Sequence, residues 1–229
     1  MRFAPYSFSK LSTYQQCPLR FKFKYIDKIP EGKFDDSALV KGSNVHSILE
    51  NYSEVRQQNS IVEKFLKCDI AQKYLPAILG SSKSVKEFNI GLDAKLNPSK
   101  YSDKSTIFRG KVDLTTVIDK TLNIIDYKTG KYKEEKYQSY DQLMFYAIYY
   151  FIRYPKIDKI RISYVYIEAQ LENEMILERK YLSSYIERLI KTINSVENDT
   201  QFIKNKSILC NWCPYKETCE AGNDSKWIS

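Results

Sequence analysis

The sequence predicts an α/β fold in which a central mixed β-sheet, between Ser84 and Tyr181, is flanked by helices. Two observations support this fold class. Runs of alternating apolar and polar residues recur within this region, and stretches with helical spacing of apolar residues lie before, between and after them. A chain of 229 residues has room for one large domain, or for one domain with a small appendage.

The first 80 residues are expected to form a helical section. In the stretch Ser9–Ile26, either Ser9 or Ser12 could serve as the N-cap of a helix. Pro18 follows Cys17 in the same stretch, and a proline at this point is typical of the start or break of a helix.

Two further helices are predicted in this section. Asp27–Lys41 should be a loop, and the helix after it should begin with Ser43 as its N-cap, which places His46 in the first turn. A lone histidine there is usually a surface or capping residue. The next helix is expected over Ile61–Tyr74, with Cys68 as a small buried residue.

The predicted strands follow in the second part of the chain. They are Ser84–Leu96, Ile107–Ile118, Leu122–Tyr127, Lys159–Glu168 and Met175–Tyr181. The second and third should form a hairpin around Asp119 and Lys120, because only a short turn separates them. Helices are predicted over Tyr137–Tyr154, which Pro155 stops, and over Ser183–Val196.

Three charged residues occupy the predicted hairpin strands. Asp113 lies in the first strand, and Asp126 and Lys128 end the second. A strand has a side-chain period of two, so Asp126 and Lys128 share one face, while Ile125 and Tyr127 point to the other. Two carboxylates with water suit Mg²⁺ or Mn²⁺, which lower the pKa of a bound water, and a nearby lysine could orient that water or stabilise developing charge. The pattern alone is a weak signal, because surface strands often carry an aspartate two residues before a lysine.

Cysteines are concentrated near the end of the chain. Cys210, Cys213 and Cys219 form the pattern C-x2-C-x5-C, and Cys17 is the best candidate for a fourth ligand. Four sulfur ligands fit either zinc or an iron–sulfur cluster, and the spacing does not decide between them. Unligated thiols are the remaining alternative. The odd total of five cysteines, without a signal peptide, argues against a disulfide framework.

The charge and hydropathy patterns restrict the partners and the location. The net charge of +8 and the pI near 9.0 suit a polyanionic partner, although a solvated lysine surface would look the same. No stretch of about 18 uncharged apolar residues is present, so we expect no membrane span. The first residues lack the apolar core of a signal peptide, and a cytoplasmic setting is therefore expected.

The ordered set of motifs resembles the PD-(D/E)XK nuclease superfamily over nearly the whole chain. The motifs are His46, GKVDL with Asp113, IIDYKTGK with Asp126 and Lys128, Gln142-x3-Tyr146, and C-x2-C-x5-C with Cys17 far upstream. The sequence is most similar to the RecB-type branch, which includes the AddB nuclease domain and the small CRISPR-associated RecB-like nucleases that carry an iron–sulfur cluster. Many members have glutamate where this chain has Asp126, and RecB-type members commonly have aspartate.

The resemblance implies an organisation for the chain. Residues 1–229 would form a single nuclease domain with a restriction-endonuclease-like core over 84–200. The helical section of residues 1–80 would precede this core. Residues 205–229, together with Cys17, would form an iron–sulfur lobe.

The resemblance also implies residue roles. The metal ligands would be His46, Asp113, Asp126 and the backbone carbonyl of Tyr127. The catalytic residues would be Asp113, Asp126 and Lys128. Glu87 matches a glutamate on the strand before the metal aspartate, and Gln142 and Tyr146 would orient the lysine or contact DNA. A four-iron–four-sulfur (4Fe-4S) cluster would be bound by Cys17, Cys210, Cys213 and Cys219.

The expected function is hydrolysis of DNA phosphodiester bonds with Mg²⁺ or Mn²⁺, as an exonuclease on single-stranded DNA or DNA ends. A non-catalytic DNA-binding or scaffold protein of the same fold is the first alternative, and a zinc-stapled protein of unrelated function is the second. No G-x-x-x-x-G-K-[ST] motif is present, so we expect a stand-alone bacterial, archaeal or phage nuclease domain or one subunit of a larger assembly. DNA repair, recombination, phage DNA metabolism and CRISPR adaptation all remain open as pathways.

Overall fold

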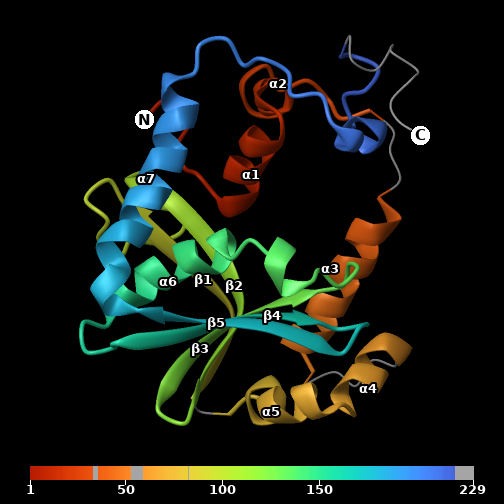
Figure 1. Ribbon diagram of the computed structural model, residues 1–229, viewed down its shortest axis with the longest axis vertical. Coiled ribbons are helices and arrows are strands. Elements are labelled where there is room, and N and C mark those ends of the chain that lie inside the picture. Colours follow the sequence, from red (N-terminus) through yellow and green to blue (C-terminus); the bar gives the residue numbers. More distant parts are fainter. Residues whose placement is uncertain (33–35, 53–58, 82, 220–229) are drawn as a thin grey trace.

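A five-stranded mixed sheet forms the centre of the protein (Figure 1). The computed structural model describes residues 1–32, 36–52, 59–81 and 83–219. The strands lie in the order β1 (Ser84–Asp93), β2 (Thr106–Ile118), β3 (Thr121–Lys128), β4 (Lys159–Tyr166) and β5 (Leu171–Glu178). Neighbouring strands are antiparallel except β3 and β4, which are parallel. The predicted α/β class with a central mixed sheet is confirmed.

Local sequence explains how these strands are connected. Asp119 and Lys120 both adopt positive φ, 49° and 61°, and join β2 to β3 by the predicted hairpin. Paired left-handed residues form the tight turn whose twist matches that of the flanking strands. The parallel β3–β4 pair requires a longer crossover, which α6 (Asp141–Arg153) provides.

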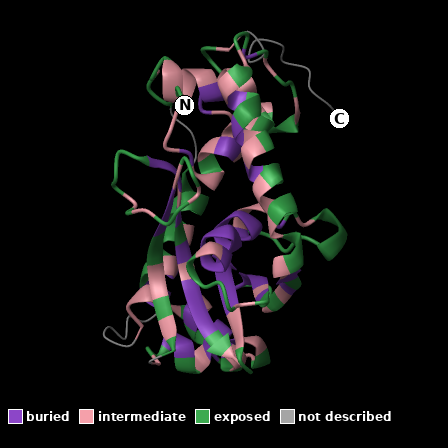
Figure 2. Ribbon diagram, turned by 90° about the vertical axis from the view of Figure 1, so that its left-hand side faces the viewer, coloured by how far each residue is buried: buried purple, intermediate pink, exposed green. Residues whose placement is uncertain are grey.

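Helices cover both faces of the sheet. On one face, α1 (Phe8–Gln16), α6 and α7 (Leu182–Asn198) contribute to a large apolar cluster. In this cluster α6 is the most buried helix, as Figure 2 shows. On the opposite face, α3 (Ser37–Glu50), α4 (Ser60–Leu66) and α5 (Asp69–Ile78) form a second cluster. The sheet is therefore the middle layer of three.

The amino-terminal and carboxy-terminal segments of the described chain both lie in the upper part of the molecule (Figure 1). After α1, the short helix α2 (Pro18–Phe21) continues into a π-helical turn (Lys22–Ile26), and Cys17 lies between α1 and α2. The backbone N–H of Gly32 donates to the carbonyl of Pro214 at 2.9 Å, and the Tyr215 hydroxyl donates to the carbonyl of Ile29 at 3.2 Å. The cysteine-rich segment is thus bound to the amino-terminal segment, while the expected lobe's residues 220–229 lie outside the described residues.

Several predicted boundaries are wrong. Helix α3 begins at Ser37 rather than after Ser43, so His46 lies in the helix interior and not in its first turn. The single predicted helix over Ile61–Tyr74 is two helices, with half-buried Cys68 in extended conformation between them. That conformation ends the hydrogen-bond ladder of α4 and starts a new helix.

Later boundaries also differ from the predictions. Helix α6 begins at Asp141 rather than Tyr137, after a separate 3₁₀ turn (Glu135–Tyr137). Strand β5 ends at Glu178 and a further 3₁₀ turn (Arg179–Tyr181) follows it. None of the helices in the described part of the chain is both long and apolar enough to cross a membrane.

Candidate active site

The candidate site lies where strands β2 and β3 separate. Their pairing runs from Ile118–Thr121 to Leu114–Ile125 and then stops, while β3 stays paired with β4 as far as Lys128. Asp113 therefore lies at the first position beyond the β2–β3 pairing. Polar side chains can be tolerated at this fork because the neighbouring backbone no longer satisfies its own hydrogen bonds.

Strand β1 is also irregular beside the fork. Glu87 has φ of 51°, and the β1–β2 register passes from Lys86–Leu114 to Phe88–Val112 without pairing Glu87. A non-glycine residue in this left-handed region is uncommon and turns its side chain out of the regular alternation. Here the result is that the Glu87 carboxylate faces the fork.

Three side chains from three elements meet at this point. His46 of α3, Glu87 of β1 and Asp113 of β2 each offer a ligand atom, and the three atoms all lie within 4.8 Å of one another. The Nδ1 atom of His46 is 3.3 Å from Oδ2 of Asp113. One imidazole nitrogen with two carboxylates is a donor set that fits a divalent cation such as Mn²⁺ or Mg²⁺.

The end of β3 supports this group. The backbone N–H of Tyr127 donates to Oδ2 of Asp113 at 2.8 Å, and its carbonyl oxygen is 3.0 Å from Nε2 of His46. Burial opposes charging of His46, but hydrogen bonding to Asp113 and the charges of Asp113, Asp126 and Glu87 outweigh it and raise the histidine pKa. The site is therefore strongly negative, as a cation site requires.

A second group lies on the α6 side of β3. The Lys128 ammonium is 2.6 Å from Oδ2 of Asp126 and donates to Oε1 of Gln142 at 3.1 Å. The Gln142 amide donates to Oδ1 of Asp126 at 2.7 Å, and it is 3.4 Å from the Tyr146 hydroxyl. The predicted shared face of Asp126 and Lys128, opposite Ile125 and Tyr127, is confirmed.

Burial dominates the electrostatics of Asp126. Only 5% of the residue is exposed, and burial, followed by the nearby Asp113 carboxylate, raises its pKa to about 6. Its Oδ2 atom is paired with the Lys128 ammonium at 2.6 Å and has no other partner among the described residues. A buried carboxylate oxygen with free lone pairs can accept one more positive ligand.

A comparison with known families identifies the fold and general chemistry. A protein-family model described as the PD-(D/E)XK nuclease superfamily matches residues 5–220. The chain belongs to this superfamily. It is therefore a nuclease-type hydrolase by family, and PD-(D/E)XK nucleases use divalent metal ions.

Two solved structures are similar to this PD-(D/E)XK chain. A protein from Eubacterium rectale, described as a candidate exonuclease, has 14% identity and a TM-score of 0.51, with 97% of this chain and 88% of that chain covered. A protein named SSO0001 has 13% identity and a TM-score of 0.41, with 93% and 85% covered. The first similarity indicates a shared fold. No curated protein matches the chain.

The structure divides the predicted site residues of this nuclease into two adjoining groups. The structure brings His46 and Asp113 together, and Glu87, which was predicted only to match a glutamate on the preceding strand, joins them. Asp126 is not part of that three-residue group, because its carboxylate is engaged by Lys128 and Gln142. The two groups are joined through the backbone of Tyr127.

Two contacts at the site were missed by the sequence analysis. The Lys111 ammonium is 2.5 Å from Oε2 of Glu87, and the Lys128 ammonium lies 4.8 Å from the centre of the Tyr164 ring. Lys111 is two residues from Asp113, so its proximity had a local signal in the sequence. Tyr164 had none, since its place beside Asp126 depends on the parallel pairing of β3 with β4.

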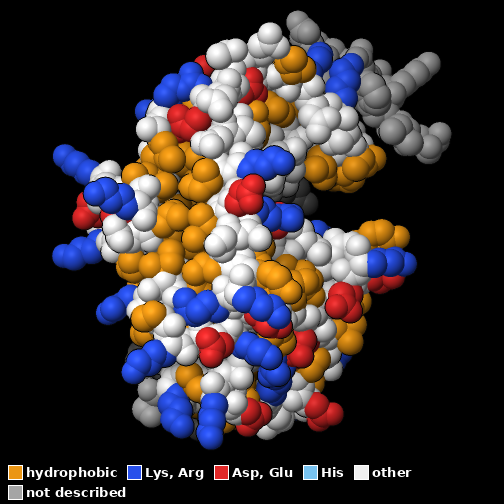
Figure 3. Space-filling model, turned by 60° about the vertical axis from the view of Figure 1, so that its left-hand side comes forward, with side chains coloured by type: hydrophobic (Ala, Val, Ile, Leu, Met, Phe, Trp, Pro, Cys, Tyr) orange, Lys and Arg blue, Asp and Glu red, His pale blue; other side chains and the backbone are white. Residues whose placement is uncertain are grey.

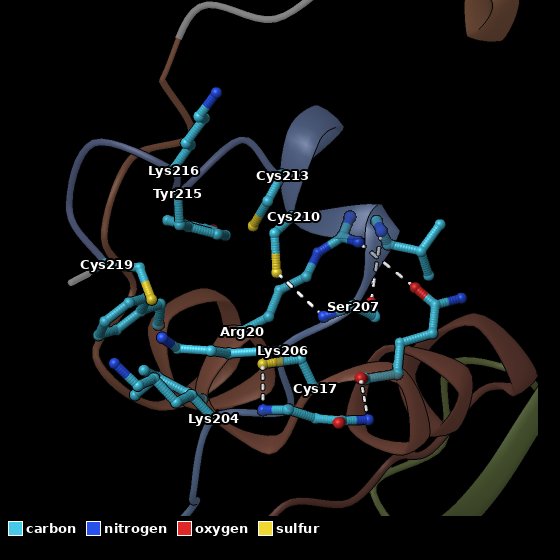
Figure 4. Close-up of a pocket in the computed structure, with 15 residues that line it drawn as sticks. Cys17, Arg20, Lys204, Lys206, Ser207, Cys210, Cys213, Tyr215, Lys216 and Cys219 are labelled. Atoms are coloured by element: carbon cyan, nitrogen blue, oxygen red, sulfur yellow. Dashed lines mark hydrogen bonds between the residues drawn. The ribbon is translucent and has the colours of Figure 1, made fainter. Parts of the chain in front are cut away.

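The four predicted cysteines line one pocket between α2 and the cysteine-rich segment (Figure 4). Cys17, Cys210, Cys213 and Cys219 share this pocket with Arg20. All are free thiols, and in the described residues no three cysteine sulfurs lie within 4.8 Å of one another. Burial raises the pKa of Cys213, against the lowering effect of Arg20.

Proposed function

We propose that this protein is a metal-dependent deoxyribonuclease of the RecB-type branch, acting as an exonuclease on single-stranded DNA or DNA ends. The observation that carries the proposal is the arrangement at the fork. The Lys128 ammonium is fixed between Asp126 and Gln142, and Lys128 follows Tyr127, whose backbone contacts Asp113 and His46 of the three-residue group.

A Mg²⁺ or Mn²⁺ ion would be held by His46, Asp113 and Asp126, with the Tyr127 carbonyl as a further oxygen donor. The clustered ligand atoms of His46 and Asp113 support this set, and Asp126 precedes Tyr127 on β3, where its Oδ2 atom is paired with Lys128. When bound, the ion supplies a polarised phosphate and a water of lowered pKa. Glu87 adds negative charge that favours cation binding. Lys111, which pairs with Glu87, partly neutralises that charge.

Lys128 would act on the phosphate. Its ammonium has three donors, and Asp126 and Gln142 occupy two directions, so one remains for a phosphate oxygen. A fixed positive charge in a partly buried site stabilises the extra negative charge of the transition state without reorganisation. Gln142 would be a positioning residue for this lysine, and Tyr146 would support the glutamine.

The choice of DNA as substrate has independent support from charge. The net charge of +8 attracts a polyanion, and the family chemistry is that of nucleases. The exonuclease assignment is supported by the name of the E. rectale protein, whose fold this chain shares.

We also propose that the cysteine pocket binds a 4Fe-4S cluster that holds the two ends of the described chain together. Four cysteines lining one pocket fit a four-thiolate group. A tetrahedral zinc ion with Zn–S bonds of about 2.3 Å requires its sulfurs to be about 3.8 Å apart. In the described residues no three cysteine sulfurs lie within 4.8 Å of one another, so the sulfurs are not held at the spacing of a zinc site, and the cluster proposal rests on the four cysteines that share one pocket.

The test of the nuclease activity uses end-labelled single- and double-stranded DNA and protein purified without oxygen. Cleavage should require Mn²⁺ or Mg²⁺, stop with EDTA, and be lost in Lys128→Ala and Asp126→Ala. Lys64→Ala, at an exposed position of α4, is the matched control and should cleave normally. A folded protein that binds DNA but does not cut it would overturn the enzyme assignment in favour of a scaffold.

The cluster is tested separately by iron and sulfide content and by visible absorption. A brown protein with about four irons, and loss of that iron in Cys213→Ser, is the expected result. A colourless protein that contains zinc would overturn the cluster proposal and leave the nuclease proposal intact.

A further inference from the structure

Two adjoining hollows lie along α6 on the side of β1 to β3, away from the candidate active site. The larger has a volume of about 740 Å³ and lies between the β2–β3 hairpin and the end of α6. The smaller, of about 560 Å³, continues along β1. Phe88 lines both, so we treat them as one feature, the β1–α6 groove.

Positive charge gathers around this groove. Its basic lining residues are Lys83, Lys100, Lys120, Arg153, Lys156 and Lys159. None of them has a carboxylate within 4.0 Å in the described part of the chain. Asp158 is the one acidic residue of the lining. Figure 3 shows lysine and arginine side chains gathered over the lower part of this face.

Unpaired like charges repel one another, so their accumulation in one hollow has an electrostatic cost. Elsewhere on the protein, lysines such as Lys22, Lys24 and Lys73 have carboxylate partners at 2.7, 2.5 and 3.0 Å. The groove lysines lack such partners. This is the charge pattern expected where an external anion supplies the neutralisation.

Aromatic faces lie between these charges. Phe88 is 37% exposed and Tyr154 is 48% exposed, and the Phe88 ring lies 6.1 Å from the ring of Tyr149. Tyr150 also lines the groove, although only 5% of the residue is exposed. Exposed rings can stack on the bases of a single strand, while lysines without carboxylate partners contact its phosphates.

We propose that the β1–α6 groove binds a single-stranded segment of DNA at a distance from the cleavage site. This inference rests on the proposed function for its substrate, but not for any catalytic residue. The groove borders Leu122 at one end of β3, and the fork contains Lys128 at the other. At about 3.3 Å per residue this separation is about 20 Å, which is roughly four to six nucleotides.

A single strand is favoured over a duplex because stacked, paired bases have no free face for Phe88 or Tyr154. The lysines would contact successive phosphates, and the rings would contact the bases between them. The segment would be the part of the substrate strand beyond the scissile bond, so the groove would retain the strand between successive cuts.

The experiment measures binding of fluorescein-labelled 25-nucleotide oligothymidylate by anisotropy over a salt series, with EDTA present to prevent cleavage. Lys120→Gln/Lys156→Gln should weaken binding about tenfold at low salt. It should also reduce the slope of log affinity against log salt by about 1.4, since each phosphate contact on a single strand contributes ~0.7. Phe88→Ala should weaken binding several-fold with the slope unchanged.

Matched controls separate this site from general charge and from catalysis. Lys64→Gln/Lys67→Gln removes two exposed charges from the opposite face and should leave affinity and slope unchanged. Cleavage of a three-nucleotide substrate, which is too short to span from the fork to the groove, should be the same in the groove variants as in the wild type. A 25-base-pair blunt duplex should lose no affinity in Phe88→Ala.

Unchanged affinity and slope in both groove variants would overturn the proposal, as would an equal loss in the Lys64→Gln/Lys67→Gln control. The two proposals fail in different ways. If the groove variants weaken DNA binding but the wild type does not cleave DNA, only the proposed nuclease function is overturned. If the wild type cleaves DNA but the groove variants bind it as well as the wild type, only this inference is overturned.

Discussion

Replacing Gln142 tests whether one amide fixes the two charged groups of the site. In Gln142→Leu, Asp126 loses the 2.7 Å bond from the amide and Lys128 loses its 3.1 Å acceptor. A hydrogen bond to a charged group contributes ~1.5–3 kcal/mol, and an acceptor left buried without a partner costs a similar amount. We therefore expect the free energy of unfolding to fall by about 2–3 kcal/mol.

The activity should fall for a separate reason. Replacement of a residue that orients a metal ligand or catalytic group typically costs roughly 10- to 100-fold in activity or metal affinity. Gln142→Glu separates the two contacts, because glutamate can still accept from Lys128 but cannot donate to Asp126. It places a second carboxylate against Asp126, so its loss of activity should equal or exceed that of Gln142→Leu, although the Lys128 contact is kept.

The assays are urea denaturation and kcat/KM on single-stranded DNA over a Mn²⁺ titration. Gln138→Leu is the matched control, since Gln138 accepts a hydrogen bond from Tyr166 and touches neither Asp126 nor Lys128. Gln142→Leu with wild-type kcat/KM at every Mn²⁺ concentration would refute the positioning role. A loss of stability alone, equal to that in Gln138→Leu, would reduce Gln142 to a packing residue.

Two further predictions concern charge. Because the folded-state pKa of Asp126 is raised to about 6, the native protein without metal binds a proton that the unfolded chain releases near pH 4. The free energy of unfolding of the wild type should therefore fall as pH rises from about 4 to 6, by ~2–3 kcal/mol relative to that of Asp126→Asn. Denaturation in EDTA at each pH measures this difference. Parallel pH curves of the two proteins would contradict the prediction. In the cysteine pocket, the Nε atom of Arg20 is buried and has no hydrogen-bond partner. Arg20→Met removes this positive charge and should lower the reduction potential of a bound cluster at unchanged iron content. Redox titration measures the potential, and an unchanged value would contradict the prediction.

The sequence predicted the parts of the site that depend on local periodicity. The two-residue period of a strand was sufficient to place Asp126 and Lys128 on one face, and the short turn was sufficient for the hairpin. It could not predict the break at Asp113. Val112 and Leu114, which regular alternation would put on one face, pack in different apolar clusters.

Other features depended on contacts distant in sequence. Gly42 comes just before the predicted N-cap Ser43, yet it lies inside α3, where a Cβ would lie 3.1 Å from Oγ1 of Thr129. The glycine thus allows α3 to approach the end of β3, and this approach brings His46 to the Tyr127 carbonyl. No helix-start signal in the sequence contains that information.

Gly110 likewise allows a close contact with a residue distant in sequence. A glycine within a strand has no side chain, so it lets a neighbouring group approach the backbone closely. In the structure the approaching group is the ring of Tyr146, and a Cβ at Gly110 would lie 2.3 Å from Cε1 and 2.9 Å from Cδ1. Tyr146 is 6% exposed and packed in the main apolar cluster, so its ring has little room to move.

Gly110→Ala should therefore act on the site through Tyr146 and Gln142. Overpacking of a core typically costs ~1–3 kcal/mol, and the displaced ring would disturb the glutamine 3.4 Å from its hydroxyl, lowering kcat without a matching rise in KM. Tyr146→Leu removes the obstructing ring atoms. In a double-mutant cycle, Gly110→Ala should cost much less stability in the Tyr146→Leu background than in wild type. Additive losses would show that the glycine is required for some other reason, and that Tyr146 does not link β2 to Lys128.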